Sequence, residues 1–290
     1  VYNYSFVGEQ SLSKLNLDAS RYLKLVNPIS EQHVFLRQNL LIGLLQNARL
    51  NQFNYNDFGL FELGRIFLPL PGEYIKDSKG ELLPYQGKRL SMLVAGQDGA
   101  AIFSRIKGLL DLLFSSLWPQ AQLELAALEI PPAWAQAEQA AAVYCAGKEL
   151  GVVGLLDDKL GNAFGLKIKI ALVEINFQEL LSLAMLMPSR RYQEVPKYPP
   201  VVRDLAFVVN EKILYNDFWK VLVNFHELLK KVELFDIYQG GALEENQKSW
   251  AFHLTYQAGD RTLTAEEVDL IQADLIQKCQ DQFEAQIRNF

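Results

Sequence analysis

The chain has 290 residues, of which half are hydrophobic and about a fifth are charged, and its formal net charge is −6. This length fits two ordinary domains, and the balance of residues is that of a globular protein with enough apolar material for a core. The acidic charge argues against a general nucleic-acid-binding protein, which usually has a basic excess. We find no signal-like segment and no run of about 20 apolar residues, so we expect a cytoplasmic protein that does not enter a membrane. The sequence starts at Val1 in mid-pattern without an initiator Met, and we expect a fragment of a longer polypeptide.

The cysteines and histidines carry no disulfide or metal signature. Cys145 and Cys279 lie far apart and stand in no partner motif, so we expect two reduced, buried thiols. His33, His226 and His253 are scattered and lack the spacing of metal ligands. The sequence therefore predicts no metal site.

The first predicted unit covers residues 1–190 and mixes helices with antiparallel strands. A turn at 27–30 ends in Ser30, which can cap a helix. That helix is predicted from apolar residues at four-residue spacing, namely Leu36, Leu40, Leu44 and Ala48. The stripe is either core or subunit interface, and the pattern does not separate the two. The elements predicted after it are a strand at 60–67 ended by Pro69, Pro71 and Gly72, a strand at 90–95, a helix at 102–117, and strands at 151–156 and 169–175.

The second predicted unit covers residues 191–290 and opens on a proline-rich hinge. Prolines bias the residues before them toward extended conformations, so a linker followed by a strand is expected. Beyond the hinge the pattern predicts the order strand, helix, strand, strand, helix, short strand, with the first helix at 216–231 and a capping box of Thr264 and Glu267 at the second. This is a split βαβ sandwich, in which two helices cover one face of a sheet and the other face stays open.

Alternation predicts which side chains of residues 249–256 point to that open face. Successive residues of a strand point to opposite sides, and four bulky side chains share one side: Trp250, Phe252, Leu254 and Tyr256. We expect these four beneath the helices, because exposing them would be costly. The open face then carries Ser249, Ala251, His253 and Thr255.

On the neighbouring strand, Phe235 and Ile237 are expected in the core, which places Asp236 and Tyr238 outward. The open face then suits an unstacked RNA base, with Tyr238 as a stacking platform, Asp236 and Ser249 reading base edges, and His253 as a further contact. The alternative is that Asp236 and Tyr238 are ordinary solvated strand residues. Residues 190–290 contain 12 basic and 16 acidic side chains, so RNA contacts here must rely on stacking and hydrogen bonds more than on phosphate neutralisation.

The chain also resembles a known family. Residues 197–290 are similar to the ferredoxin-fold anticodon-binding domain that ends the β subunit of bacterial phenylalanyl-tRNA synthetase. This likeness is carried by Pro199-Pro200-Val201-Val202-Arg203-Asp204-Leu205, Leu234-Phe235-Asp236-Ile237-Tyr238, Lys248-Ser249, Arg261-Thr262-Leu263-Thr264 and Ala285-Gln286-Ile287-Arg288. The preceding residues resemble the synthetase-like core of the same subunit through Tyr4-Ser5-Phe6-Val7, Asn27-Pro28-Ile29-Ser30, Leu36-Arg37, Leu60-Phe61-Glu62-Leu63-Gly64-Arg65 and Ile106-Lys107-Gly108. The ordered succession of these motifs covers essentially the whole chain.

The resemblance implies an α+β fold, with a non-catalytic class II synthetase-like antiparallel-sheet domain at 1–190 and a ferredoxin-like βαββαβ anticodon-binding domain at 191–290. It implies a cytoplasmic heterotetramer of two α and two β subunits that joins phenylalanine to tRNA(Phe) with ATP and Mg²⁺. The α subunit performs the chemistry in this family, so we expect a scaffold and tRNA-binding fragment with no catalytic residue and no cofactor of its own. The resemblance also implies that class II activation needs an arginine on a central strand for the ATP α-phosphate and a second arginine after a glycine-rich turn. Here only Arg65 follows the lone Gly64, and we expect a structural or interface role for Arg65.

The resemblance further implies that an Asp-x-Tyr strand and the serine of the next strand touch the anticodon. Those positions are Asp236, Tyr238 and Ser249 here, which agrees with the open-face hypothesis. The alternative function is a ferredoxin-like protein-interaction module, whose open sheet docks another protein and does not contact RNA.

Overall fold

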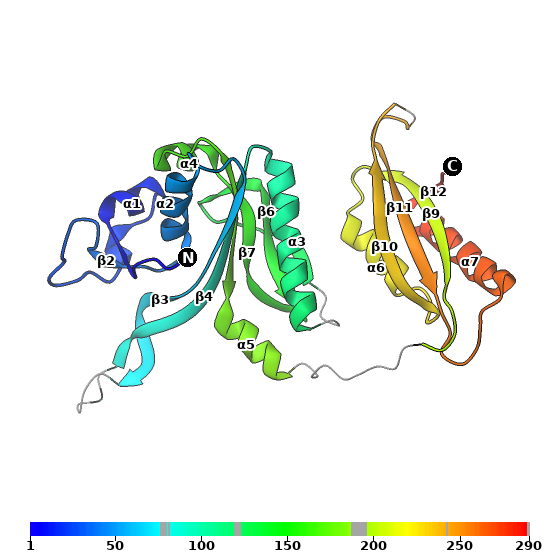
Figure 1. Ribbon diagram of the computed structural model, residues 1–290, viewed down its shortest axis with the longest axis horizontal. Coiled ribbons are helices and arrows are strands. Elements are labelled where there is room, and N and C mark those ends of the chain that lie inside the picture. Colours follow the sequence, from blue (N-terminus) through cyan, green and yellow to red (C-terminus); the bar gives the residue numbers. More distant parts are fainter. Residues whose placement is uncertain (76–79, 81, 119–122, 187–195, 242, 289–290) are drawn as a thin grey trace. The chain divides into compact units, whose positions relative to one another are not determined.

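The computed structural model describes residues 1–75, 80, 82–118, 123–186, 196–241 and 243–288. They form two compact units, Val1–Arg190 and Arg191–Phe290, and each combines helices with antiparallel sheets (Figure 1). Within these described ranges, none of the helices has the length and apolarity that a membrane span requires.

A six-stranded antiparallel sheet forms the centre of the first unit, in the order β3-β4-β8-β7-β6-β5 (Figure 1). Its strands are β3 (Phe58–Ile75), β4 (Leu82–Gly96), β5 (Leu123–Ala127), β6 (Ala135–Cys145), β7 (Lys148–Leu156) and β8 (Lys169–Asn176). One face packs against α1 (Glu9–Lys14), α2 (Leu41–Asn51) and α4 (Asp158–Phe164), and the other against α3 (Gly99–Leu117) and α5 (Phe177–Leu186). A two-stranded sheet of β1 (Phe6–Val7) and β2 (Phe35–Leu36) and the 3₁₀ helix η1 (Ala19–Arg21) complete the unit.

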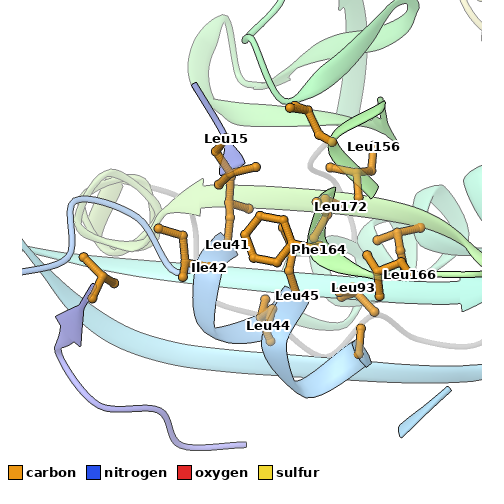
Figure 2. Packing of buried hydrophobic residues seen from close by; sticks show 14 of the residues in the cluster. Leu15, Leu41, Ile42, Leu44, Leu45, Leu93, Leu156, Phe164, Leu166 and Leu172 are labelled. Atoms are coloured by element: carbon orange, nitrogen blue, oxygen red, sulfur yellow. The ribbon is translucent and has the colours of Figure 1, made fainter. Parts of the chain in front are cut away.

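The central strands are apolar on both faces because helices cover both sides of the sheet. Figure 2 shows Leu45 of α2 and Phe164 of α4 beside Leu93 of β4, all at most 3 % exposed. The next residue of β4, Val94, points to the opposite face and is buried in the layer beneath α3. Burial of each such side chain contributes about 1.5–3 kcal/mol to the free energy of folding, so the two apolar faces of this sheet form the core of the unit.

The first helix predicted from the leucine stripe starts later than expected. Leu36 lies in β2, where its N–H donates to the Leu23 carbonyl at 2.8 Å, and the helix α2 begins at Leu41. The hydrogen bonds of this pairing use backbone groups that a helix would need, so the turn that ends at Ser30 does not lead directly into a helix, and Ser30 does not cap α2. The later stripe residue Leu44 is fully buried within the unit, so the stripe is core.

The strand predicted at 60–67 is longer than its prolines suggested. β3 continues through Pro69 and Pro71 to Ile75. It lies at the edge of the sheet, where a residue without an N–H removes no bond to a further strand. The other predicted elements of this unit lie inside β4, α3, β7 and β8.

The second unit is a four-stranded antiparallel sheet in the order β10-β11-β9-β12 (Figure 1). Its elements are β9 (Val201–Asn210), α6 (Tyr215–Val223), β10 (Leu229–Tyr238), β11 (Gln247–Tyr256), α7 (Ala265–Phe283) and β12 (Gln286–Ile287). This succession confirms the predicted ferredoxin-like βαββαβ order. The helix predicted at 216–231 is shorter, because the chain turns after Val223 and Leu229 already pairs with Tyr256 of β11.

Both helices of this unit pack on the same face of the sheet. Trp250, Phe252, Leu254 and Tyr256 are at most 3 % exposed and share a cluster with Phe218 of α6 and Val268 and Leu275 of α7. The facing predicted for β11 is therefore confirmed. The capping box is also present, since the Glu267 N–H donates to Thr264 Oγ1 at 3.3 Å and the Thr264 N–H donates to Glu267 Oε2 at 3.0 Å.

Candidate nucleic-acid interface

The sheet face of the second unit that points away from α6 and α7 is called the open face here. Direct cross-strand partners share a face, so the register of β10, β11 and β9 defines its rows. Tyr238 of β10 lies opposite Ser249 of β11, and Asp236 lies opposite Ala251. One step further along β11, His253 lies between Glu233 of β10 and Asp204 of β9. The structure therefore brings the four predicted residues Asp236, Tyr238, Ser249 and His253 to one face.

Tyr238 contacts a cation from the C-terminal segment. The Arg288 N–H donates to the Ala206 carbonyl on β9 at 2.9 Å, and its guanidinium carbon lies 4.6 Å from the centroid of the Tyr238 ring on β10. Arg288 follows β12 at the far edge of the sheet, so this cation–π contact with Tyr238 crosses both β9 and β11. Sequence reasoning missed this residue. The only signal was a basic residue in the last motif shared with the family.

The polar side chains of the open face differ in how accessible they are. Asp236 is exposed and Tyr238 is half-buried, whereas Ser249 is only 3 % exposed. Ser249 therefore belongs to the floor of the face beside Tyr238, and its hydroxyl is less accessible than alternation alone implied. A base that meets this face encounters the phenol ring and the Asp236 carboxylate first.

A β-bulge in β10 corrects the predicted position of Phe235. The register shifts between Leu234, which lies opposite Phe252, and Asp236, which lies opposite Ala251. The extra residue puts Phe235 and Asp236 on the same side of the sheet. Phe235 is 45 % exposed, and its ring stacks on His253 at 4.0 Å between centroids and 12° between planes. The expectation that Phe235 lies in the core is therefore wrong.

The second residue expected in the core beside it is also exposed. Ile237 lies opposite Trp250, on the helix side of the sheet, but 57 % of its surface remains accessible. β10 is an edge strand of the sheet, so a side chain there has neighbours on one flank only. The expected burial of Ile237 is wrong for that reason, although its facing is correct.

His253 is held between an aromatic ring and a carboxylate. Its Nδ1 lies 2.6 Å from Asp204 Oδ1, while Phe235 covers a face of the imidazole. All three side chains come from the open face of adjacent strands, β9, β11 and β10. The imidazole is thus a positioned group, and its Nδ1 is engaged within the protein.

Charge is distributed unequally between the two sides of the second unit. The outer surface of α7 carries exposed acidic residues along its length, namely Glu266, Asp269, Asp274 and Asp281. The one basic residue of that helix is Lys278. The open face carries two cations, Arg288 beside Tyr238 and Lys231 opposite Thr255, together with the carboxylates of Asp204, Glu233 and Asp236. A phosphate backbone is therefore repelled more strongly by the α7 side than by the open face.

The buried carboxylates of the first unit already have protein partners. Glu62 accepts from Arg37 Nη1 at 2.7 Å and from Asn3 Nδ2 at 2.7 Å, and both members of the ion pair are nearly inaccessible. Glu174 accepts from the Leu40 N–H at 2.8 Å and from the Ser91 hydroxyl at 2.9 Å. Burial raises the pKa of Glu174, and these two hydrogen bonds oppose the rise.

A magnesium site needs several carboxylate oxygens free for the ion, and both oxygens of Glu62 are engaged by protein donors. Over the residues that the structure describes, no group of three or more His, Cys, Asp or Glu side chains could hold a metal. Arg65 is exposed and donates from Nη1 to Gln86 Oε1 at 3.0 Å, which links β3 to β4. Cys145 and Cys279 are buried free thiols, as expected.

Comparison with known proteins agrees with this architecture. Residues 1–177 match the family model described as the phenylalanyl-tRNA synthetase beta chain CLM domain, and residues 196–288 match the ferredoxin-fold anticodon binding domain. The solved structure of pyrrolysyl-tRNA synthetase from Desulfitobacterium hafniense is similar in fold, with a TM-score of 0.50 and 12 % identity over 64 % of this chain and 63 % of that chain.

Curated relatives match along nearly the whole chain. The phenylalanine–tRNA ligase beta subunit of Moorella thermoacetica is 31 % identical over 99 % of this chain and 36 % of its own length. The Geobacillus kaustophilus subunit is 30 % identical over 98 % of this chain and 35 % of its own length. The Carboxydothermus hydrogenoformans subunit is 29 % identical over 100 % of this chain and 36 % of its own length. The chain thus spans about a third of the length of these relatives. It belongs to the phenylalanyl-tRNA synthetase beta chain family.

Proposed function

We propose that this chain serves within the β subunit of phenylalanine–tRNA ligase, where its second unit binds the anticodon loop of tRNA(Phe) through the open face. Asp236, Tyr238, Ser249 and His253 are the proposed contacts. The observation that carries this proposal is the exposed Asp236 beside the Tyr238 ring on a sheet face without helices. Base stacking on an aromatic ring and hydrogen bonds to a carboxylate are the means by which sheet surfaces hold unpaired RNA bases.

The charge distribution favours this side of the unit. The acidic residues of α7 lie on the side that packs away from the open face, and Arg288 lies next to the proposed stacking platform. The net acidic charge therefore does not oppose RNA at the open face as strongly as composition alone suggests.

We propose that residues 1–190 form a non-catalytic class II synthetase-like core, which supports the catalytic α subunit in an α2β2 assembly. Phe61 and Leu63 of β3 are 62 % and 45 % exposed. Their cross-strand partners on β4, Met92 and Leu90, belong to the apolar layer beneath α3 and α5. Phe61 and Leu63 continue that apolar layer onto a part of the sheet that α3 and α5 leave exposed. We propose that a protein partner buries this exposed apolar surface.

The complete enzyme is proposed to act in the cytoplasm and to use ATP and Mg²⁺, which supply activation of the amino acid. We assign both to the α subunit, as the family resemblance implies. In this chain Glu62 and Glu174 hold protein donors and Arg65 pairs with Gln86, so these residues have structural roles. ATP–pyrophosphate exchange by the isolated chain tests this assignment, and we expect none.

Titration with two RNA hairpins tests the anticodon role. One is the anticodon stem-loop of a phenylalanine tRNA, and the other is the same hairpin with its three anticodon bases replaced. The proposal predicts tighter binding of the first. Equal binding of both hairpins, or binding of neither, contradicts anticodon reading. If the open face then binds another protein and no RNA, the second unit is a protein-interaction module.

Co-expression tests the scaffold role. The chain is expected to co-purify with the α subunit, and Phe61→Glu is expected to reduce that association. Ile130→Glu, at a residue that is 85 % exposed in the segment between β5 and β6, is the matched control. Equal association of both variants contradicts the proposed surface.

A further inference from the structure

We infer that Phe235 is a second base-stacking platform on the open face, which holds a different nucleotide from the one that stacks on Tyr238. The inference deepens the proposed function and rests on it. The structural basis is an exposed aromatic ring that the β10 bulge directs to the RNA-binding side.

The exposure of Phe235 is built into the strand. Regular alternation would follow Phe235 with an inward residue, but the bulge places Phe235 and Asp236 next to each other on the open face. Bulges of this kind re-aim side chains and are frequent beside functional sites. The neighbouring Leu234 still packs against the core, so the bulge changes the outer side without opening the inner one.

The ring is also supported from within the protein. One face of Phe235 lies parallel to the imidazole of His253, and the Asp204 carboxylate holds that imidazole through Nδ1. A ring fixed in this way loses little rotamer freedom when a base stacks on its other face. Besides its proposed contact with RNA, His253 then acts as a positioning residue, which holds the Phe235 ring in place.

Phe235 and Tyr238 are too far apart to hold one base between them. The ring of Phe235 lies against His253, four residues along β11 from Ser249, the partner of Tyr238. Four residues of a strand span about 13 Å at about 3.3 Å each. Bases stacked in a helix are about 3.4 Å apart, so two rings at this separation hold bases that are splayed out and not consecutive in a stack. The open face thereby fixes the path of the loop across β10 and β11.

A binding cycle with abasic RNA tests this inference in the full 290-residue chain. The anticodon stem-loop is prepared with one abasic site at each loop position in turn, and its affinity is measured for the wild-type chain and for Phe235→Ala. With the intact hairpin, we expect Phe235→Ala to weaken binding about 5- to 150-fold, as for one stacked base, and Phe235→Trp to retain it. At one loop position, the abasic hairpin should bind the wild-type chain and Phe235→Ala with equal affinity. The same comparison of the wild-type chain with Tyr238→Ala should identify a different loop position.

Two controls separate the possible failures. Ile237→Ala removes another exposed apolar side chain of β10 from the helix side of the sheet, and should leave the affinity unchanged. An unchanged melting temperature of Phe235→Ala establishes that the variant folds. Wild-type affinity of Phe235→Ala, with Tyr238→Ala weakened, overturns the second platform and leaves the proposed function standing. A loss that is the same for every abasic hairpin also overturns it, and absence of binding by the wild-type chain overturns both.

Discussion

Tyr238 and Ser249 are direct cross-strand partners on the open face, but only Tyr238 is accessible to a ligand. Ser249 is 3 % exposed beside it, and the guanidinium of Arg288 lies 4.6 Å from the centroid of the Tyr238 ring. The ring is therefore the first group of this row that a base meets. Contact with the Ser249 hydroxyl requires a rearrangement of the side chains around it.

Replacing Tyr238 with Ala is expected to weaken binding of the anticodon stem-loop by about 1–3 kcal/mol, the effect of one base stacked on an aromatic ring. The melting temperature should change little, because the ring lies outside the core and its contact with Arg288 contributes only about 0.5–1 kcal/mol. Calorimetry of RNA binding and of unfolding measures both effects. A large fall in melting temperature with unchanged RNA affinity would show that the ring has a structural role.

Replacing Arg288 with Ala is expected to weaken RNA binding and to lower the salt dependence of the binding constant by about one unit of slope. The reason is that Arg288 places a cation beside the proposed platform. Lys278→Ala removes one positive charge from α7, on the other side of the sheet, and serves as the control. An equal change of slope in both variants would mean that only the net charge matters.

The facing of β11 could be predicted because four large side chains alternate with small or polar ones over eight residues. The corresponding prediction for β10 failed at Phe235, because a bulge adds one residue without leaving a mark in the hydrophobic pattern. The helix predicted to reach residue 231 failed for a related reason. Phe225 and Leu228 continue the helical spacing, although the chain has already turned after Val223.

The first unit was harder to predict because neighbouring strands decide its elements. β6 is rich in alanine, which favours helices, but it forms a strand because it pairs with β5 and β7. The contact between Arg288 and Tyr238 could not be predicted either. Fifty residues separate the two in sequence, and only the position of the C-terminal segment beside β9 brings them together.

Replacing Glu62 with Ala is expected to lower the free energy of unfolding of the first unit by about 3–5 kcal/mol. The substitution leaves the Arg37 guanidinium buried without its carboxylate partner. Asp111→Ala is the control, because it removes a half-exposed i,i+4 pair with Lys107 and should cost about 0–0.5 kcal/mol. Urea denaturation compares the two, and equal losses would contradict a structural role for the buried pair.

Cys279 is expected to resist thiol reagents at pH 8 as long as the second unit is folded. Burial raises the pKa of its thiol to about 12, and the thiolate is the reactive form. In the unfolded chain the thiol ionises near its ordinary pKa of about 8.5. The neutral, buried Cys279 thiol therefore makes its full contribution to the free energy of unfolding below about pH 8.5, and this contribution is lost as the pH rises toward 12. Labelling of Cys279 at the same rate with and without denaturant would contradict its burial.

Hydroxyl-radical footprinting of the 290-residue chain, with and without the anticodon stem-loop, reports which side chains the RNA covers and so tests binding through the open face. We expect that Tyr238 and Phe235 become protected, while Leu270 of α7, which is 70 % exposed, is oxidised as before. Protection of Leu270 with unchanged oxidation of Tyr238 would contradict RNA binding through the open face.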